Sequence, residues 1–209
     1  QTLTPISNLK IYGEILSETN HENQEEIATI LEQTEKLDFL IQSLVKLSRM
    51  ESGIIAVHSE DTTIKQMLEY IQQQFNVKVR EKNITMSLCD TDLHIRCDSK
   101  WTVEALGNIV DNAIKYTACG GNVQIKVEQY SFFVKIDIID DGIGIEKEEI
   151  PKIFGRFYRS LSVADQPGVG IGLFLAREII QAQKGYIKVT SKRGKGSTFS
   201  VFLPIAKKE

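Results

Sequence analysis

The chain has 209 residues, of which 42% are hydrophobic and 25% are charged, and its net charge is −3. This balance is typical of a soluble globular protein and excludes disordered, collagen-like and disulfide-stapled chains. The negative charge provides no broad positive field, so we expect no nucleic-acid partner. No apolar run approaches the roughly 18–20 residues that cross a bilayer, so membrane attachment is expected only through segments absent from this chain.

The first 50 residues have the spacing of two packed helices. Apolar side chains recur at steps of three and four in two stripes, from Ile6 to Leu16 and from Ile27 to Leu44. This alternation predicts a helical hairpin with the polar stretch 17–25 as its turn. The second stripe is too wide for a two-helix seam, so we expect two copies to form an antiparallel four-helix bundle, which makes the protein a homodimer.

After Ser52-Gly53 the pattern changes to mixed α/β. Helices are predicted over 61–81, 99–116 and 172–184, and strands over 54–58, 84–88, 93–97, 123–127, 132–138, 186–190 and 198–203. The predicted fold class is therefore α+β. A helical hairpin over residues 1–52 precedes an α/β sandwich over residues 58–207, in which helices cover one face of a mixed sheet.

The predicted helix 99–116 carries an aligned set of polar side chains. Glu104, Asn108 and Asn112 are four residues apart and stack on one face, with Lys115 and Tyr116 near its C-terminal end. Polar groups that face inward need partners. A structural network could supply them, and so could a hydrated Mg²⁺ that carries phosphates, since this ion takes a few oxygen ligands and keeps several waters.

Two glycine-containing stretches add to this helix. Asp140-Asp141-Gly142-Ile143-Gly144 follows an apolar strand, where a carboxylate can accept a hydrogen bond from an amino group in a pocket. Gly168-Val-Gly170-Ile-Gly172-Leu173 leads into a helix, where free backbone N–H groups attract an anion. The stretch 159–167 suits a mobile cover over the site. The spacings match neither a P-loop nor a Rossmann fingerprint, so another ATP-binding fold is required.

In order and separation, the blocks over residues 98–204 resemble the GHKL ATPase superfamily and, within it, the catalytic core of sensor histidine kinases. Residues 108–116 resemble the asparagine box, and residues 140–144, 168–173 and 194–198 resemble the three glycine boxes. Residues 153–159, Ile-Phe-Gly-Arg-Phe-Tyr-Arg, are similar to the phenylalanine box.

The hairpin also resembles this family. Leu3-Thr4-Pro5-Ile6 is similar to the segment after the phospho-accepting histidine of the dimerisation and phosphotransfer domain. The resemblance places that histidine one position ahead of Gln1, outside this chain. His21, His58 and His94 do not occupy the acceptor position.

The resemblance implies a site for ATP and Mg²⁺. Asp140 would accept a hydrogen bond from the adenine amino group, and Asn108 and Asn112 would hold the metal ion directly or through water. Arg159, or alternatively Arg156, would neutralise the γ-phosphate, with Phe154 and Phe157 anchoring the cover in the core. The other residues implied to bind ATP are Lys115, Tyr116, Gly142, Gly144, Gly168, Gly170, Gly172, Leu173 and Thr198.

The implied activity is transfer of the γ-phosphoryl group to a histidine and then to an aspartate on a response regulator receiver domain. Thr4 matches the residue that positions water when similar kinases dephosphorylate that partner. The implied location is a cytoplasmic domain of a cell-membrane sensor. Two alternatives stay open: a nucleotide-binding dimerisation module without phosphotransfer, and another GHKL ATPase or serine kinase, in which Glu104 resembles the water-activating base.

Overall fold

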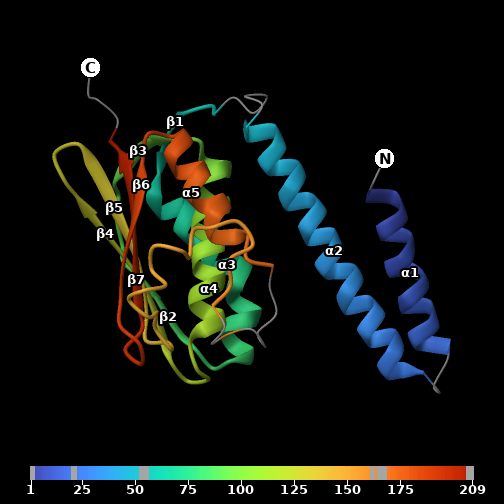
Figure 1. Ribbon diagram of the computed structural model, residues 1–209. Helices are drawn as coiled ribbons and strands as arrows, with labels where there is room; N and C mark the ends of the chain where they lie inside the picture. The colour runs from blue at the N-terminus through green and yellow to red at the C-terminus, as the bar shows by residue number, and fades with distance from the viewer. Residues whose placement is uncertain (1–2, 20–22, 52–56, 161–162, 164–168, 206–209) are drawn as a thin grey trace. The chain divides into compact units, whose positions relative to one another are not determined.

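The computed structural model describes residues 3–19, 23–51, 57–160, 163 and 169–205 (Figure 1). The chain divides into two compact units, residues 1–56 with 165–169 and residues 57–164 with 170–209. Within the described ranges, no helix is both long and apolar enough to cross a membrane.

The first unit is a helical hairpin. Helix α1 spans Leu3–Thr19 and helix α2 spans Gln24–Glu51, so both helices extend into the predicted turn over residues 17–25. Residues 20–22 lie outside the described ranges. Ile6 and Ile27 are buried where the helices meet. Gly13 allows close approach, because a Cβ at this position would lie 2.6 Å from Leu31 Cδ2.

Much of the apolar surface of this hairpin stays exposed to solvent in a single chain. Its exposed apolar side chains are Leu9, Ile11, Tyr12, Ile15, Leu16, Ile30, Leu37, Leu44 and Val45. Burial of apolar area is the main favourable contribution to folding and association, so a surface of this kind indicates an interaction face.

The second unit is an α/β sandwich. Its helices are α3 (Ile64–Glu81), α4 (Ser99–Tyr116) and α5 (Gly172–Ala182). Strands β2 (Thr85–Leu88), β4 (Asn122–Gln129), β5 (Phe133–Asp140), β7 (Ser197–Pro204) and β6 (Tyr186–Ser191) form one sheet in the order β2-β4-β5-β7-β6. Only the β2–β4 pair of this sheet is parallel, so the sheet is mixed, as expected.

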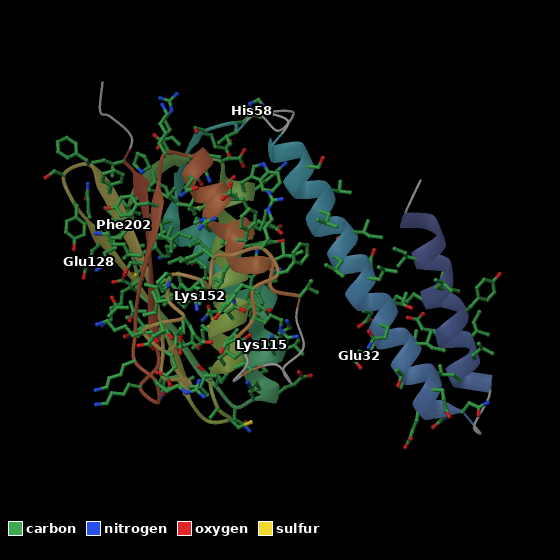
Figure 2. The ribbon with its side chains drawn as sticks, in the orientation of Figure 1. Glu32, His58, Lys115, Glu128, Lys152 and Phe202 are labelled. Carbon is green, nitrogen blue, oxygen red and sulfur yellow. The ribbon has the colours of Figure 1, made fainter. Side chains whose placement is uncertain are left out.

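The three helices cover one face of this sheet (Figure 1). Buried apolar residues alternate along the central strands, among them Ile136 and Ile138 on β5 and Phe199 and Val201 on β7, and they form the core with α4 and α5. The opposite face carries a stacked pair of rings, Tyr186 and Phe202, and Figure 2 shows Phe202 on the side of the sheet away from the helices.

The prediction for residues 54–63 was wrong where the structure describes them. Residues 57–59 have no regular structure, and residues 54–56 lie outside the described ranges. The strand β1 is instead Glu60–Thr63, which pairs antiparallel with β3 (His94–Cys97), and helix α3 begins at Ile64 rather than near Asp61. Pairing with a strand more than 30 residues away decides this segment, and local periodicity carries no signal of it.

Candidate nucleotide-binding site

Helix α4 begins at a well-formed cap and presents two different faces. The Asp98 carboxylate accepts a hydrogen bond of 3.1 Å from the backbone N–H of Trp101, as an N-cap residue should. One face, which includes Leu106, Ile109 and Val110, is buried in the core. The predicted polar residues Glu104, Asn108, Asn112, Lys115 and Tyr116 are all only partly buried.

The polar face of α4 offers amide groups. Asn108 Nδ2 donates a hydrogen bond of 2.9 Å to the Glu104 carbonyl, which fixes the orientation of the Asn108 amide. Within the described part of the chain, the Asn112 side chain makes no hydrogen bond, although it is partly buried. A half-buried amide without a partner is suited to a polar ligand.

The loop after β5 lies against the C-terminal end of α4. The Ile143 backbone N–H donates a hydrogen bond of 3.2 Å to the Tyr116 carbonyl. Gly142 is required at this contact, because a Cβ would lie 2.5 Å from the Tyr116 carbonyl oxygen and 2.9 Å from Asp140 Oδ1. The structure therefore brings the predicted asparagine and first glycine blocks together.

Asp140 ends β5 with its side chain on the helix-covered face. It is only 7% exposed, and burial raises its pKa to about 6. Oδ1 accepts hydrogen bonds from the backbone N–H groups of Gly142 (2.9 Å) and Ser197 (3.3 Å). Both hydrogen bonds to this carboxylate within the described residues use Oδ1, so Oδ2 remains available as an acceptor.

Ser191 holds together the two loops beside Asp140. Its hydroxyl accepts a hydrogen bond of 2.8 Å from the Ile145 N–H and donates one of 2.9 Å to the Gly196 carbonyl. The Ser197 hydroxyl lies 2.9 Å away. Because the single proton of Ser191 is directed to a carbonyl, Ser197 is the donor between the two hydroxyls. No pattern in the sequence indicated this link.

The glycine segment that leads into α5 lies beside helix α4. Gly170 has a φ of +77°, and a Cβ there would lie 2.6 Å from the Tyr158 carbonyl oxygen. Gly172 begins α5, and its Cβ would lie 3.0 Å from Asn108 Oδ1. Leu173 follows as the second residue of the helix and is partly buried. The predicted glycine segment thus reaches the amide face of α4.

Positive charge collects at the C-terminal end of α4, where Figure 2 shows Lys115. Burial lowers the pKa of Lys115, and the nearby charge of Arg159 lowers it further. Burial raises the pKa of Tyr116, and the Arg159 charge opposes that change. Arg159 Nη2 also donates a hydrogen bond of 3.0 Å to the Val163 carbonyl. Two cations held this close favour an anionic ligand.

The predicted block over residues 153–159 meets helix α5. The Arg156 guanidinium lies over the Phe174 ring of α5, 4.6 Å from its centroid. Phe154 is partly buried and has the Arg177 guanidinium 5.7 Å from its ring centroid. Phe157 does not anchor in the core as expected, because it is 53% exposed and has a φ of +61°.

Thr198 lies on the other face of the sheet from Asp140. In the β5–β7 register Asp140 is opposite Ser197, whereas Thr198 is opposite Ile139. Successive side chains of a strand point to opposite faces, so Ser197 and not Thr198 shares the face of Asp140. The side chain of Thr4 and all of Gly168 lie outside the described residues, as do residues 161–162 and 164–167 of the expected cover.

Two family models match the chain. Residues 97–207 match the histidine kinase-, DNA gyrase B-, and HSP90-like ATPase family, and residues 1–53 match the His Kinase A (phospho-acceptor) domain. Among curated proteins, the sensor histidine kinase WalK of Bacillus subtilis is 32% identical over 96% of this chain. SrrB of Staphylococcus aureus is 30% identical over the same share. The chain spans about a third of the length of each, 34% and 36%.

Solved structures give the same result for the fold. The mycobacterial sensor histidine kinase MprB matches 70% of this chain and 97% of its own, with a TM-score of 0.63 and 25% identity. A complex of the histidine kinase ThkA with the response regulator TrrA matches 98% of this chain and 57% of its own, with a TM-score of 0.74. The ThkA match is 21% identical and shows the fold alone.

Proposed function

The chain belongs to the family of histidine kinase-, DNA gyrase B- and HSP90-like ATPases and is a histidine kinase catalytic core, and on that premise we propose that its α/β unit binds Mg-ATP and transfers the γ-phosphoryl group to a histidine. The observation that carries this proposal is the meeting of three chain segments around Asp140 and α4. The Ile143–Tyr116 hydrogen bond and the close contact between Gly172 and Asn108 bring them together.

Asp140 is the group proposed to recognise adenine. Its Oδ1 is occupied by two backbone donors, so the carboxylate is fixed in orientation and Oδ2 can accept from the adenine amino group. A hydrogen bond to a charged group contributes roughly 1.5–3 kcal/mol. Ser197 takes the place of Thr198 in this proposal, because it faces Asp140 and donates to it through its backbone.

Lys115 and Arg159 are proposed to bind the phosphates, together with backbone N–H groups at the start of α5. Burial lowers the pKa of Lys115 and the Arg159 charge lowers it further, so an anion between the two cations would relieve their repulsion. Asn108 and Asn112 are proposed to hold Mg²⁺ through an amide oxygen or a bridging water. Magnesium is commonly held by one or two protein oxygens plus substrate phosphates, and here it would neutralise phosphate charge.

In phosphoryl transfer the protein contributes mainly positioning and charge stabilisation. Arg159 is proposed to bind the γ-phosphate, because its charge acts to lower the pKa values of Lys115 and Tyr116 and it therefore lies near both. Arg156 instead stacks on Phe174. The acceptor histidine is predicted just ahead of Gln1. The regulatory partner proposed is a response regulator receiver domain, as in the ThkA–TrrA complex.

The hairpin is proposed to form a homodimer. Its match to the phospho-acceptor domain and the apolar side chains that one hairpin leaves exposed both support a four-helix bundle. Light scattering at several concentrations would measure the dimer. A change of Ile15 to Asp is expected to weaken it, because a charge would enter an apolar interface.

Calorimetry with Mg-ATP tests the nucleotide site. Asn112→Ala is expected to weaken binding at least tenfold, because it removes an amide proposed to hold the metal ion. Asn76→Ala, which removes an exposed amide from α3, is the matched control and should leave affinity unchanged. Unchanged affinity in Asn112→Ala would show that the site assignment is wrong.

Phosphoryl transfer is tested separately on the full-length protein with labelled ATP. Label is expected on a histidine, recognised because phosphohistidine is lost in acid, and then on a receiver domain. Nucleotide binding without any label would favour a binding module that lacks transfer.

A further inference from the structure

Lys82 lies where the end of α3 meets the end of α4, outside the asparagine, phenylalanine and glycine blocks. It is the first residue after α3, and its backbone N–H still donates to the Lys78 carbonyl at 3.2 Å. The side chain crosses to the end of α4, where Nζ donates to the carbonyls of Ile114 (2.9 Å), Lys115 (2.9 Å) and Thr117 (2.8 Å). A lysine ammonium has three N–H donors, and this site uses all of them.

This arrangement completes the end of the helix that carries the proposed phosphate-binding residues. The last four carbonyls of an α-helix have no partner within the helix and carry partial negative charge. Here Lys82 covers the carbonyls of Ile114, Lys115 and the C-cap residue Thr117, and the Ile143 N–H covers that of Tyr116. The carbonyl of Ala113 accepts from the Thr117 N–H. One cationic side chain and one loop N–H therefore hold the turn that bears Lys115 and Tyr116.

We infer that Lys82 is a positioning residue for nucleotide binding, acting through Lys115, Tyr116 and the loop that follows Asp140; this inference rests on the proposed function. Without Lys82, three carbonyls in a partly buried place would lack donors, and the last turn of α4 would fray. Fraying would move the Lys115 ammonium and loosen the Tyr116 carbonyl that receives Ile143. The Lys82 ammonium itself is directed at three backbone carbonyls.

The test compares Lys82→Met with the unmodified chain, using Mg-ATP and adenosine as separate ligands. Lys82→Met keeps much of the chain length and removes the donors. It should weaken Mg-ATP about tenfold and adenosine by a clearly smaller factor, because Lys115 serves the phosphates directly, whereas Asp140 keeps both of its backbone donors. A merely destabilised fold would lower both affinities by the same factor. Equal losses, or no loss, would overturn the inference.

Two further variants serve as controls. Lys65→Met removes a lysine from the first turns of α3, where it pairs with Asp90 on the surface, and should change neither affinity. Lys82→Arg keeps the charge but has a planar fork in place of three tetrahedral donors, so it should recover part of the Mg-ATP affinity. Failure of Lys82→Arg to exceed Lys82→Met would count against a charge-dependent cap.

Hydrogen exchange supplies a readout that stays valid if Lys82→Met melts at a lower temperature. Amides of residues 113–117 are expected to exchange faster, while those at the start of α4 stay protected. Uniform loss of protection along α4 would contradict the inference. If the unmodified chain binds neither Mg-ATP nor adenosine, the proposed function is wrong and the inference is wrong with it. If the unmodified chain binds Mg-ATP and Lys82→Met binds it with the same affinity, only the role of Lys82 is contradicted.

Discussion

Gly172 lies directly against the amide of Asn108, so that a Cβ at Gly172 would be 3.0 Å from Asn108 Oδ1. The two residues are 64 positions apart in the chain. Their contact sets α5 beside the polar face of α4, so a side chain at the first residue of α5 would displace the Asn108 amide. Gly172 does not have a positive φ, so its backbone conformation does not require glycine. The close approach to Asn108 is the reason that glycine is favoured at this position.

Gly172→Ala is therefore expected to separate stability from binding. The helix should tolerate alanine, so the free energy of unfolding should stay within about 0.5 kcal/mol or rise. The Asn108 amide must shift by a few tenths of an ångström, and Mg-ATP affinity should fall roughly 3–10-fold, a change worth about 0.7–1.4 kcal/mol. Calorimetry and urea unfolding would measure the two effects.

Gly107→Ala is the matched control for this change. It lies within α4, where a Cβ would meet Phe75 Cε2 at 3.9 Å, an ordinary contact. It should raise stability by about 0.5–1 kcal/mol without altering affinity. Equal affinity losses in both variants would show that the contact with Asn108 has no special role.

Asp140→Asn is expected to stabilise the folded protein while it weakens nucleotide binding. The pKa of Asp140 is raised to about 6 mainly by burial, so at pH 7 the folded protein bears the cost of a buried charge. Asparagine keeps an oxygen for the Gly142 and Ser197 donors and removes this cost, which is worth about 1–3 kcal/mol. Loss of the second acceptor oxygen should weaken Mg-ATP roughly 10–100-fold. Lower stability at pH 7 would contradict the prediction.

The same pKa predicts two opposite dependences on pH. Folded Asp140 holds its proton more tightly than the unfolded chain does, so its contribution to stability is greatest below about pH 4 and is lost as the pH rises through about 6. The proposed nucleotide binding uses the ionised carboxylate, so affinity is expected to fall as the pH drops through about 6. Both the free energy of unfolding and the Mg-ATP affinity are measured against pH in the unmodified protein and in Asp140→Asn, and the difference between the two proteins isolates the effect of Asp140. If the two proteins show the same dependence on pH, Asp140 does not have this role.

Gly144 and Gly120 form a pair that tests how much close packing adds to backbone strain. Both have positive φ, +65° and +80°. A Cβ on Gly120 has nothing within 4 Å, whereas one on Gly144 would collide with the Lys192 carbonyl oxygen. Gly120→Ala should cost about 1–2 kcal/mol from φ alone, and Gly144→Ala over 3 kcal/mol. Urea unfolding measures the loss of unfolding free energy in each variant. Equal losses would show that the contact with the Lys192 carbonyl adds nothing to the strain of a positive φ.

Much of the secondary structure could be predicted from local pattern. Helix α4 has the predicted bounds of 99–116, because an N-cap, a continuous apolar face and a defined end all lie within one segment. Strands β4 and β5 follow their period-two alternation. The polar residues of α4 were predicted on one face for the same reason, since helical spacing fixes their angular positions.

Predictions that depend on strand register cannot be made from local pattern. Thr198 and Ser197 are adjacent, and both are small hydroxyl residues after a glycine turn. Which one faces Asp140 depends on the pairing of β7 with β5, where a slip of one residue reverses the face. Phe157 was expected to anchor the cover in the core, but its backbone is left-handed and the residue is exposed.

The sequence by itself determined the helical hairpin, the α+β class and the residue types of the candidate site, because helix and strand periodicity and turn chemistry are properties of short segments. Tertiary structure alone decided that Lys82 caps α4, that Ser191 joins two loops and that Gly172 touches Asn108. These relationships join residues far apart in the chain or depend on an exact approach of backbones. Such contacts exist only after the core has packed, so no local pattern encodes them.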